Sequence, residues 1–92
     1  MPHTIPVPQT LGRMQVGEDG VIERLSPDAM QNMGTPFDEL ERRMIGMGFV
    51  EGARVIMIHE APLSKDPIVV LLDESRVALR RNEANAVWVK IS

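Results

Sequence analysis

One grouping in this sequence has the residue types of a metal site: His59-Glu60, with Asp66 a few residues later. Imidazole and carboxylate groups are common ligands of divalent transition metals. Adjacent residues of a regular β-strand point to opposite faces, however, so His59 and Glu60 cannot hold one ion from such a strand. They also do not form an HExxH motif, because position 63 is leucine. The pattern predicts a solvated strand end and leaves His59 and Glu60 as the two metal candidates.

Other chemistries find less support. Four of the seven methionines lie at helical spacing: Met30, Met33, Met44 and Met47. Thioethers favour Cu(I), but methionine also fills irregular cores, and we interpret these residues as core. The absence of cysteine excludes a thiol nucleophile and a disulfide. The serines lie in capping or turn contexts, and no glycine-rich phosphate loop is present, so we expect that the protein is not an enzyme.

Length and composition bound the fold and the partners. A chain of 92 residues, 43% hydrophobic and 25% charged, is typical of one globular domain. A net charge of -3 argues against a nucleic-acid partner, which a basic surface would favour. The longest apolar run, residues 68–72, is far shorter than the roughly 20 residues that cross a bilayer. The N-terminus does not have the pattern of a secretory signal. We therefore expect a cytoplasmic protein without direct membrane insertion.

The N-terminal third contains few regular signals. Residues 1–10 hold three prolines and no charged residue, which predicts a flexible tail before a single domain over residues 11–92. A first strand is predicted over Val21–Leu25. The following SPDAMQNM segment, residues 26–33, predicts one helical turn with Ser26 as its cap.

An amphipathic helix is predicted over residues 37–47. We expect Thr35 to cap its N-terminus and Gly48 to end it in the left-handed conformation, with Phe49 packed back on Met44. One side of this helix is apolar and carries Phe37, Leu40, Met44 and Met47. The other side offers the i,i+4 pairs Asp38–Arg42 and Glu39–Arg43. Gly46 should weaken the last turn, so the helix is expected to fray there.

From Ala53 onward the hydrophobic period changes to two. Four runs are predicted as strands: Arg54–Glu60, Pro67–Leu72, Arg76–Arg80 and Ala86–Ile91. Residues 81–85 are predicted to form a single helical or 3₁₀ turn. No segment is long enough for parallel crossovers, and five short strands avoid bare edges by curling into a barrel. The predicted fold is mainly β, a small SH3-like antiparallel barrel of about five strands with an inserted α-helix.

Two features of these strands suggest a partner. Arg54–Glu60 and Pro67–Leu72 are apolar on both faces, whereas a small barrel has only one inside, so the second face must meet the helix, a second copy or a partner. Arg76, Ala78 and Arg80 share one face and form a basic stripe, which either pairs with neighbouring acids or orients an acidic partner. The predicted partner-binding residues are Leu40, Met44, Met47, Val69, Leu71, Arg76 and Arg80.

Several short motifs then carry a resemblance. A helix-ending step contains Met44, Met47, Gly48 and Phe49, followed by Gly52 and Val55. A loop and strand contain Ala61, Pro62, Asp66, Pro67 and Ile68, and a last motif contains Ala78, Leu79, Arg80, Glu83 and Ala84. Together they make residues 11–91 resemble the ferrous iron transport protein A (FeoA) family, whose SH3-like fold also forms the C-terminal domain of iron-dependent (DtxR-type) repressors. The chain departs from the family pattern at Ser64-Lys65-Asp66, at Glu51 and in the longer stretch 26–35.

The resemblance implies a non-enzymatic, cytosolic accessory protein of bacterial ferrous iron uptake. Its implied partner is the membrane ferrous iron transporter GTPase (FeoB type), with a homo-oligomer left open. No cofactor is implied, and weak divalent metal binding is left open. Two other functions stay open at this point. A metal-sensing regulatory module would need clustered ligands, and a peptide-binding adaptor would need an aromatic groove, for which the chain offers only Phe37, Phe49 and Trp88.

Overall fold

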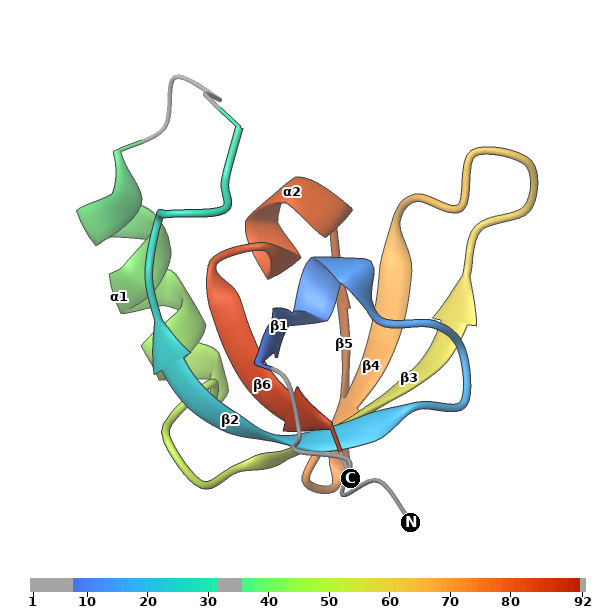
Figure 1. The fold of residues 1–92 in the computed structure, drawn as a ribbon, viewed down its shortest axis with the longest axis horizontal. Coiled ribbons are helices and arrows are strands. Elements are labelled where there is room, and N and C mark those ends of the chain that lie inside the picture. The colour runs from blue at the N-terminus through green and yellow to red at the C-terminus, as the bar shows by residue number, and fades with distance from the viewer. Residues whose placement is uncertain (1–7, 32–35, 92) are drawn as a thin grey trace, which may run out of the picture.

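Six short strands and three short helices lie along residues 8–31 and 36–91, the part of the chain that the computed structural model describes (Figure 1). The strands are β1 (Gln9–Thr10), β2 (Asp19–Leu25), β3 (Arg54–Glu60), β4 (Ile68–Leu72), β5 (Ser75–Leu79) and β6 (Val87–Ile91). The helices are the 3₁₀ helix η1 (Leu11–Arg13), α1 (Phe37–Met47) and α2 (Arg81–Ala84). This order confirms a mainly β fold with an inserted helix.

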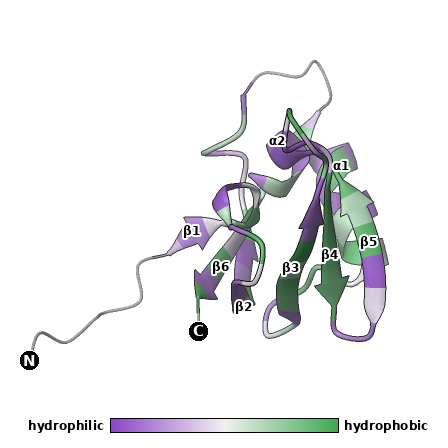
Figure 2. Cartoon of the chain, turned by 90° about the vertical axis from the view of Figure 1, so that its right-hand side faces the viewer, coloured by the Kyte–Doolittle hydropathy of each residue, from purple (hydrophilic) through white to green (hydrophobic). Residues whose placement is uncertain are grey.

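All strand pairs are antiparallel and belong to one sheet in the order β1-β6-β2-β3-β4-β5. The sheet curls so that β1, β6 and β2 form one half and β3, β4 and β5 form the other (Figure 2). The sheet has one strand more than the five that the sequence predicts. The additional strand is β1, because Gln9 and Thr10 lie in the segment predicted as a tail. Two residues are too few to show an alternating pattern, and their partners Val89 and Trp88 are distant in the sequence.

The core lies between the two halves of the sheet and takes alternate residues from each strand. In β4, for example, Ile68, Val70 and Leu72 are buried while Val69 and Leu71 are only half-buried. The core has these buried hydrophobic side chains: Leu11, Met14, Ile22, Leu40, Met44, Phe49, Ala53, Val55, Met57, Ile68, Val70, Leu72, Leu79, Ala84, Ala86, Val87 and Val89. Alternation within the strands therefore leaves a second, outward set of aliphatic side chains, as the sequence predicted.

Helix α1 closes one side of this core and ends as predicted. Gly48 has a φ of 106°, its N–H donates to the Ile45 carbonyl at 3.0 Å, and the Phe49 N–H donates to the Met44 carbonyl at 3.0 Å. These are the two hydrogen bonds of a Schellman motif, which requires a left-handed residue where glycine is favoured. Met44 and Phe49 are both buried in the core cluster.

The start and the polar side of α1 differ from the expectation. Pro36 precedes the first helical residue in an extended conformation and offers no side-chain cap, while Thr35 lies outside the described residues. Arg43 pairs with Glu83 of α2 at 2.7 Å rather than with Glu39. The predicted local pair was wrong because a tertiary partner competes with the i+4 neighbour. This ion pair joins α1 to α2, the short helix that follows β5.

The predicted helical turn after β2 is also wrong within its described residues. Ser26 Oγ accepts a hydrogen bond from the Asp28 N–H at 3.2 Å, and the Met30 N–H donates to the Pro27 carbonyl at 3.0 Å. These bonds make a turn rather than a helix, because a serine side chain can satisfy the local backbone without a following helix. Residues 32 and 33 of this segment lie outside the described residues.

Helix α1 continues through Gly46 to Met47, so Gly46 lies inside its last turn. A Cβ added at Gly46 would meet nothing within 4 Å. We therefore expect Gly46→Ala to raise the free energy of unfolding by about 0.5–1 kcal/mol, because alanine favours the helix. Gly48→Ala is the matched control and should be destabilising by about 1–2 kcal/mol, because its φ is left-handed. Urea unfolding of both variants checks this, and no gain in Gly46→Ala would mean that the last turn is not stably helical.

Candidate functional site

The second, outward set of aliphatic side chains lies on β3, β4 and β5. Directly paired residues of antiparallel strands share a face. The register pairs Ile56 with Leu71 and Leu71 with Arg76, and it pairs His59 with Val69 and Val69 with Ala78. These two rows point away from the core residues. We call them together the outer face: Ile56, His59, Val69, Leu71, Arg76 and Ala78.

The outer face has an aliphatic centre and a basic margin. Ile56, Val69 and Leu71 are half-buried, whereas His59, Arg76 and Ala78 are exposed. Arg80 lies two residues after Ala78, has an extended backbone and is exposed. Alternation along an extended chain therefore places it on the same side as Ala78. Figure 2 shows β4 as hydrophobic along its length beside a β5 that is interrupted by hydrophilic residues. The arrangement suits a partner that brings both apolar and charged groups.

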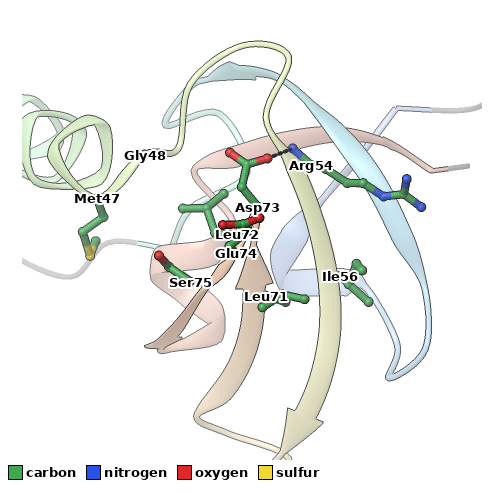
Figure 3. Close-up of a pocket in the computed structure, with 9 residues that line it drawn as sticks. All are labelled: Met47, Gly48, Arg54, Ile56, Leu71, Leu72, Asp73, Glu74 and Ser75. Atoms are coloured by element: carbon green, nitrogen blue, oxygen red, sulfur yellow. Dashed lines mark hydrogen bonds between the residues drawn. The ribbon is translucent and has the colours of Figure 1, made fainter.

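A shallow, open groove adjoins the outer face at the β4–β5 turn and has a volume of about 620 Å³ (Figure 3). Met47 at the end of α1 lines one part of it, and Ile56 and Leu71 line another. Arg54, Asp73, Glu74 and Ser75 supply polar groups along it. Asp73 Oδ1 accepts a hydrogen bond from the Arg54 N–H at 3.2 Å, which holds the turn against β3. The groove thus links Met47 to the outer face.

The structure separates the predicted partner-binding residues into two groups. Leu40 and Met44 are 2% and 1% exposed and belong to the core, so they are not available to a partner in this structure. The apolar side of α1 packs on the sheet, and of its residues only Met47, at the end of the helix, is exposed. Val69, Leu71, Arg76 and Arg80 lie on one side of β4 and β5. The structure therefore brings together five of the seven predicted residues.

The two basic residues of β5 and its end are uncompensated within the described part of the chain. Among residues 8–31 and 36–91, neither the Arg76 nor the Arg80 side chain takes part in an ion pair or hydrogen bond. By contrast, the side chains of Arg24, Arg43, Arg54 and Arg81 each have a carboxylate partner. The alternative of a solvated stripe paired with neighbouring acids therefore has no support in these contacts.

The two metal candidates lie apart, as strand geometry predicts. His59 is opposite Val69 on the outer face, whereas Glu60 is opposite Ile68, a core residue. Glu60 Oε1 accepts a hydrogen bond from Arg81 Nη2 at 2.6 Å, so its carboxylate already has a cation. The described residues contain no group of three His, Cys, Asp or Glu side chains that could hold a metal ion. His59 and Glu60 do not form a site together.

Metal binding through these residues is accordingly expected to be weak. Anaerobic titration calorimetry with Fe(II), Mn(II) or Zn(II) should show no saturable site tighter than micromolar. The reason is that a lone exposed imidazole lacks the further ligands that a tight site needs. His59→Ala should give the same titration curve as the wild type. A stoichiometric nanomolar site that disappears in His59→Ala would contradict this prediction.

Arg81 has a structural role that the sequence did not reveal. Its Nε donates to the Lys65 carbonyl at 2.7 Å, and its Nη1 donates to the Gly12 and Met14 carbonyls at 2.9 and 3.2 Å. Its backbone N–H donates to Asp66 Oδ1 at 2.9 Å. With Glu60, these partners come from two stretches, residues 12–14 and 60–66, and both are far from Arg81 in the sequence. Nothing local to Arg81 signals them.

Neither Arg81 nor Asn82 caps α2, whose N-cap residue is Arg80. Glu83 Oε1 accepts a hydrogen bond from the Arg80 N–H at 3.0 Å, as the glutamate of a capping box does. Asn82 instead exchanges hydrogen bonds with the Gln31 backbone at 2.8 and 3.1 Å. The last motif of the sequence therefore fixes the end of β5, and with it the position of Arg80.

A family model described as "FeoA domain" matches residues 9–91. No curated protein sequence matches the chain. The chain is 29% identical to a Stenotrophomonas maltophilia FeoA solved in complex with zinc, with a TM-score of 0.70 and 89% of each chain covered. That structure is described as an SH3 domain protein possibly acting as a bacterial ferrous iron transport activating factor. The expected SH3-like fold is confirmed.

Two further solved structures extend the comparison. The iron(II) transport protein A of Clostridium thermocellum is 31% identical, with a TM-score of 0.71, over 90% of this chain and 45% of that chain. An IdeR from T. acidophilum is 16% identical, with a TM-score of 0.69, over 98% of this chain and 37% of that chain. The likeness to the metal-dependent repressor is one of fold alone. In the described part of the chain, no helix is long and apolar enough to cross a membrane.

Proposed function

The chain belongs to the FeoA domain family of iron-uptake accessory proteins, and on that premise we propose that it docks on the membrane GTPase transporter of the same ferrous iron system. In this proposal the chain is cytoplasmic and binds the cytoplasmic portion of the transporter. Iron(II) is the cargo of the transporter and is not bound tightly by the chain itself. The FeoA family is non-catalytic, in agreement with the expectation from the sequence.

The outer face is the observation that best supports docking as the mode of action. It combines half-buried aliphatic side chains with two arginines that have no ion-pair partner among the described residues. Apolar groups that a small domain leaves partly exposed in one patch favour a contact surface, and unpaired charge beside them gives the contact specificity. A non-catalytic protein of this size acts through what it binds, and this surface is available for binding.

The two alternative functions have less support. A metal-sensing module needs a ligand cluster, and the described residues contain none. A peptide-binding adaptor needs exposed aromatic rings along a groove. Phe49 is fully buried, Phe37 is half-buried, and the Trp88 ring is covered by the Arg24 guanidinium at 4.7 Å. The aromatic side chains are therefore used inside the fold.

The proposal is tested by iron uptake in the bacterium that encodes the chain. Deleting the gene should lower the rate of Fe(II) uptake, and a plasmid copy should restore it. In a strain that already lacks the transporter, the same deletion should have no effect, because the chain acts through that protein. Uptake that is unchanged by the deletion would refute the proposal. An equal loss without the transporter would show that the chain acts elsewhere.

A further inference from the structure

We propose that the outer face binds an acidic, amphipathic segment of its partner, with the partner's carboxylates on Arg76 and Arg80 and its apolar side chains on Val69 and Leu71. This inference rests on the proposed docking function and specifies its chemistry. It commits to one occupant, a protein segment with acidic and apolar residues on the same side.

The spacing of the two arginines defines the acidic part of that segment. Arg76 and Arg80 are four positions apart in extended chain, which separates their Cα atoms by about 13 Å. Neither has an ion-pair partner among the described residues, although the protein as a whole carries a net charge of -3. A guanidinium group forms its best contacts with carboxylates, because its donors match both carboxylate oxygens. The segment should therefore present two acidic groups at this separation.

The apolar part follows from the strand register. Leu71 lies directly opposite Arg76, and Val69 lies directly opposite Ala78, between the two arginines. An aliphatic stripe therefore runs along β4 beside the basic stripe of β5. A partner that pairs with the arginines and lies flat on the sheet must also cover Val69 and Leu71. A purely polar ligand would leave Val69 and Leu71 without an apolar contact, so it fits this surface less well than an amphipathic segment does.

The turn at the start of β5 gives the segment a direction. Asp73 and Glu74 lie at the β4–β5 turn, next to the groove and on the Arg76 side of the face. Further carboxylates of the partner would be repelled there. The acidic residues of the segment should therefore extend from Arg76 towards Arg80 and α2, and its other end should be neutral or basic.

A second copy of the chain fits this surface less well. A two-fold contact through the outer face would place the same patch on both sides of the interface. Arg76 and Arg80 of one copy would then face a surface that carries the same arginines, and like charges across an interface are unfavourable. Charge complementarity therefore favours a different, acidic partner.

The test measures affinity for the purified cytoplasmic GTPase domain of the transporter by titration calorimetry. The chain is compared as wild type, as Arg76→Glu/Arg80→Glu, as Arg76→Ala/Arg80→Ala and as Leu71→Ser. Arg13→Glu/Arg42→Glu is the matched control, because it makes the same charge change at exposed residues of η1 and α1. Each protein is checked by circular dichroism, and each titration is repeated at low and high salt.

The expected result is that wild type and control bind alike and that their affinity falls as salt rises. Arg76→Glu/Arg80→Glu should bind roughly tenfold or more weakly, with a smaller salt dependence, because opposite charges become like charges. The alanine pair and Leu71→Ser should each weaken binding with the fold intact.

Wild-type binding that all these variants retain in full would overturn this inference and leave the proposed docking standing. Failure of the wild type to bind would overturn both. If light scattering shows that the wild type is a dimer and the Leu71→Ser variant is a monomer, the outer face binds a second copy of the chain, and the inference is overturned.

Discussion

Replacing Arg81 with alanine is expected to lower the free energy of unfolding by about 2–4 kcal/mol. The side chain is 24% exposed and donates to the carbonyls of Gly12, Met14 and Lys65 and to the Glu60 carboxylate. Removing it leaves these acceptors without their donor. Two of them, the Gly12 and Met14 carbonyls, lie in η1 or directly after it, where η1 packs against α2. Partly buried polar groups that lose a partner cost more than an exposed ion pair contributes.

Thermal unfolding followed by circular dichroism measures this effect. A domain of this size should lose about 10 °C or more in melting temperature. Arg81→Lys should restore little stability, because one ammonium group cannot reproduce the fork that reaches several acceptors at once. Arg42→Ala is the control, since Arg42 is exposed and should change stability by less than about 0.5 kcal/mol. A melting temperature of Arg81→Ala equal to that of this control would show that the network contributes nothing.

Leu40→Asp should be at least as destabilising, with an expected cost of several kcal/mol and loss of the folded state at moderate temperature. Leu40 is 2% exposed and lies in the core cluster with Met44 and Phe49. The substitution removes apolar contacts and buries a carboxylate for which the core offers no partner. Helix α1 would then lose the face that holds it on the sheet.

Ile45→Asp is the matched control on the same helix, because Ile45 is 49% exposed. Urea unfolding should separate the two variants clearly, with Ile45→Asp close to the wild type. If Leu40→Asp unfolds at the same urea concentration as Ile45→Asp, the buried side of α1 has been assigned incorrectly.

The long elements of the fold could be predicted because their signals are local. Residues 37–47 carry a helical stripe and end at a left-handed glycine, and β3 has the predicted bounds. Strand β1 could not be predicted, since two residues show no period. The stretch after Ser26 was misread because a serine before proline caps a turn and a helix equally well.

The candidate surface could be predicted in part. Aliphatic residues on both sides of β4 required an outward apolar face, and alternation put Val69 and Leu71 together on one side of the strand. The burial of Ile68, Val70 and Leu72 in the structure shows that this side is the outward one. Leu40 and Met44 are among the predicted partner-binding residues, but the structure buries both of them in the core. Sequence periodicity defines one side of a helix but does not say whether that side meets the same chain or another one.

The network of Arg81 shows a further limit. Its acceptors are backbone carbonyls on η1 and on the loop before β4, together with one carboxylate of β3. A backbone carbonyl is present at every residue, so no sequence pattern marks the ones that an arginine will reach. The tertiary packing that brings η1 and the loop before β4 next to Arg81 determines which carbonyls these are.

The central claim, that the chain docks through the outer face, is tested most directly by amide NMR spectra. The ¹⁵N-labelled chain is titrated with the unlabelled cytoplasmic GTPase domain of its transporter. The expected result is that shifts and line broadening concentrate on β4, β5 and the turn between them, while amides of β1 and β2 stay unchanged. Spectra that do not change at all, or changes that concentrate on β1, β6 and β2, would contradict the account.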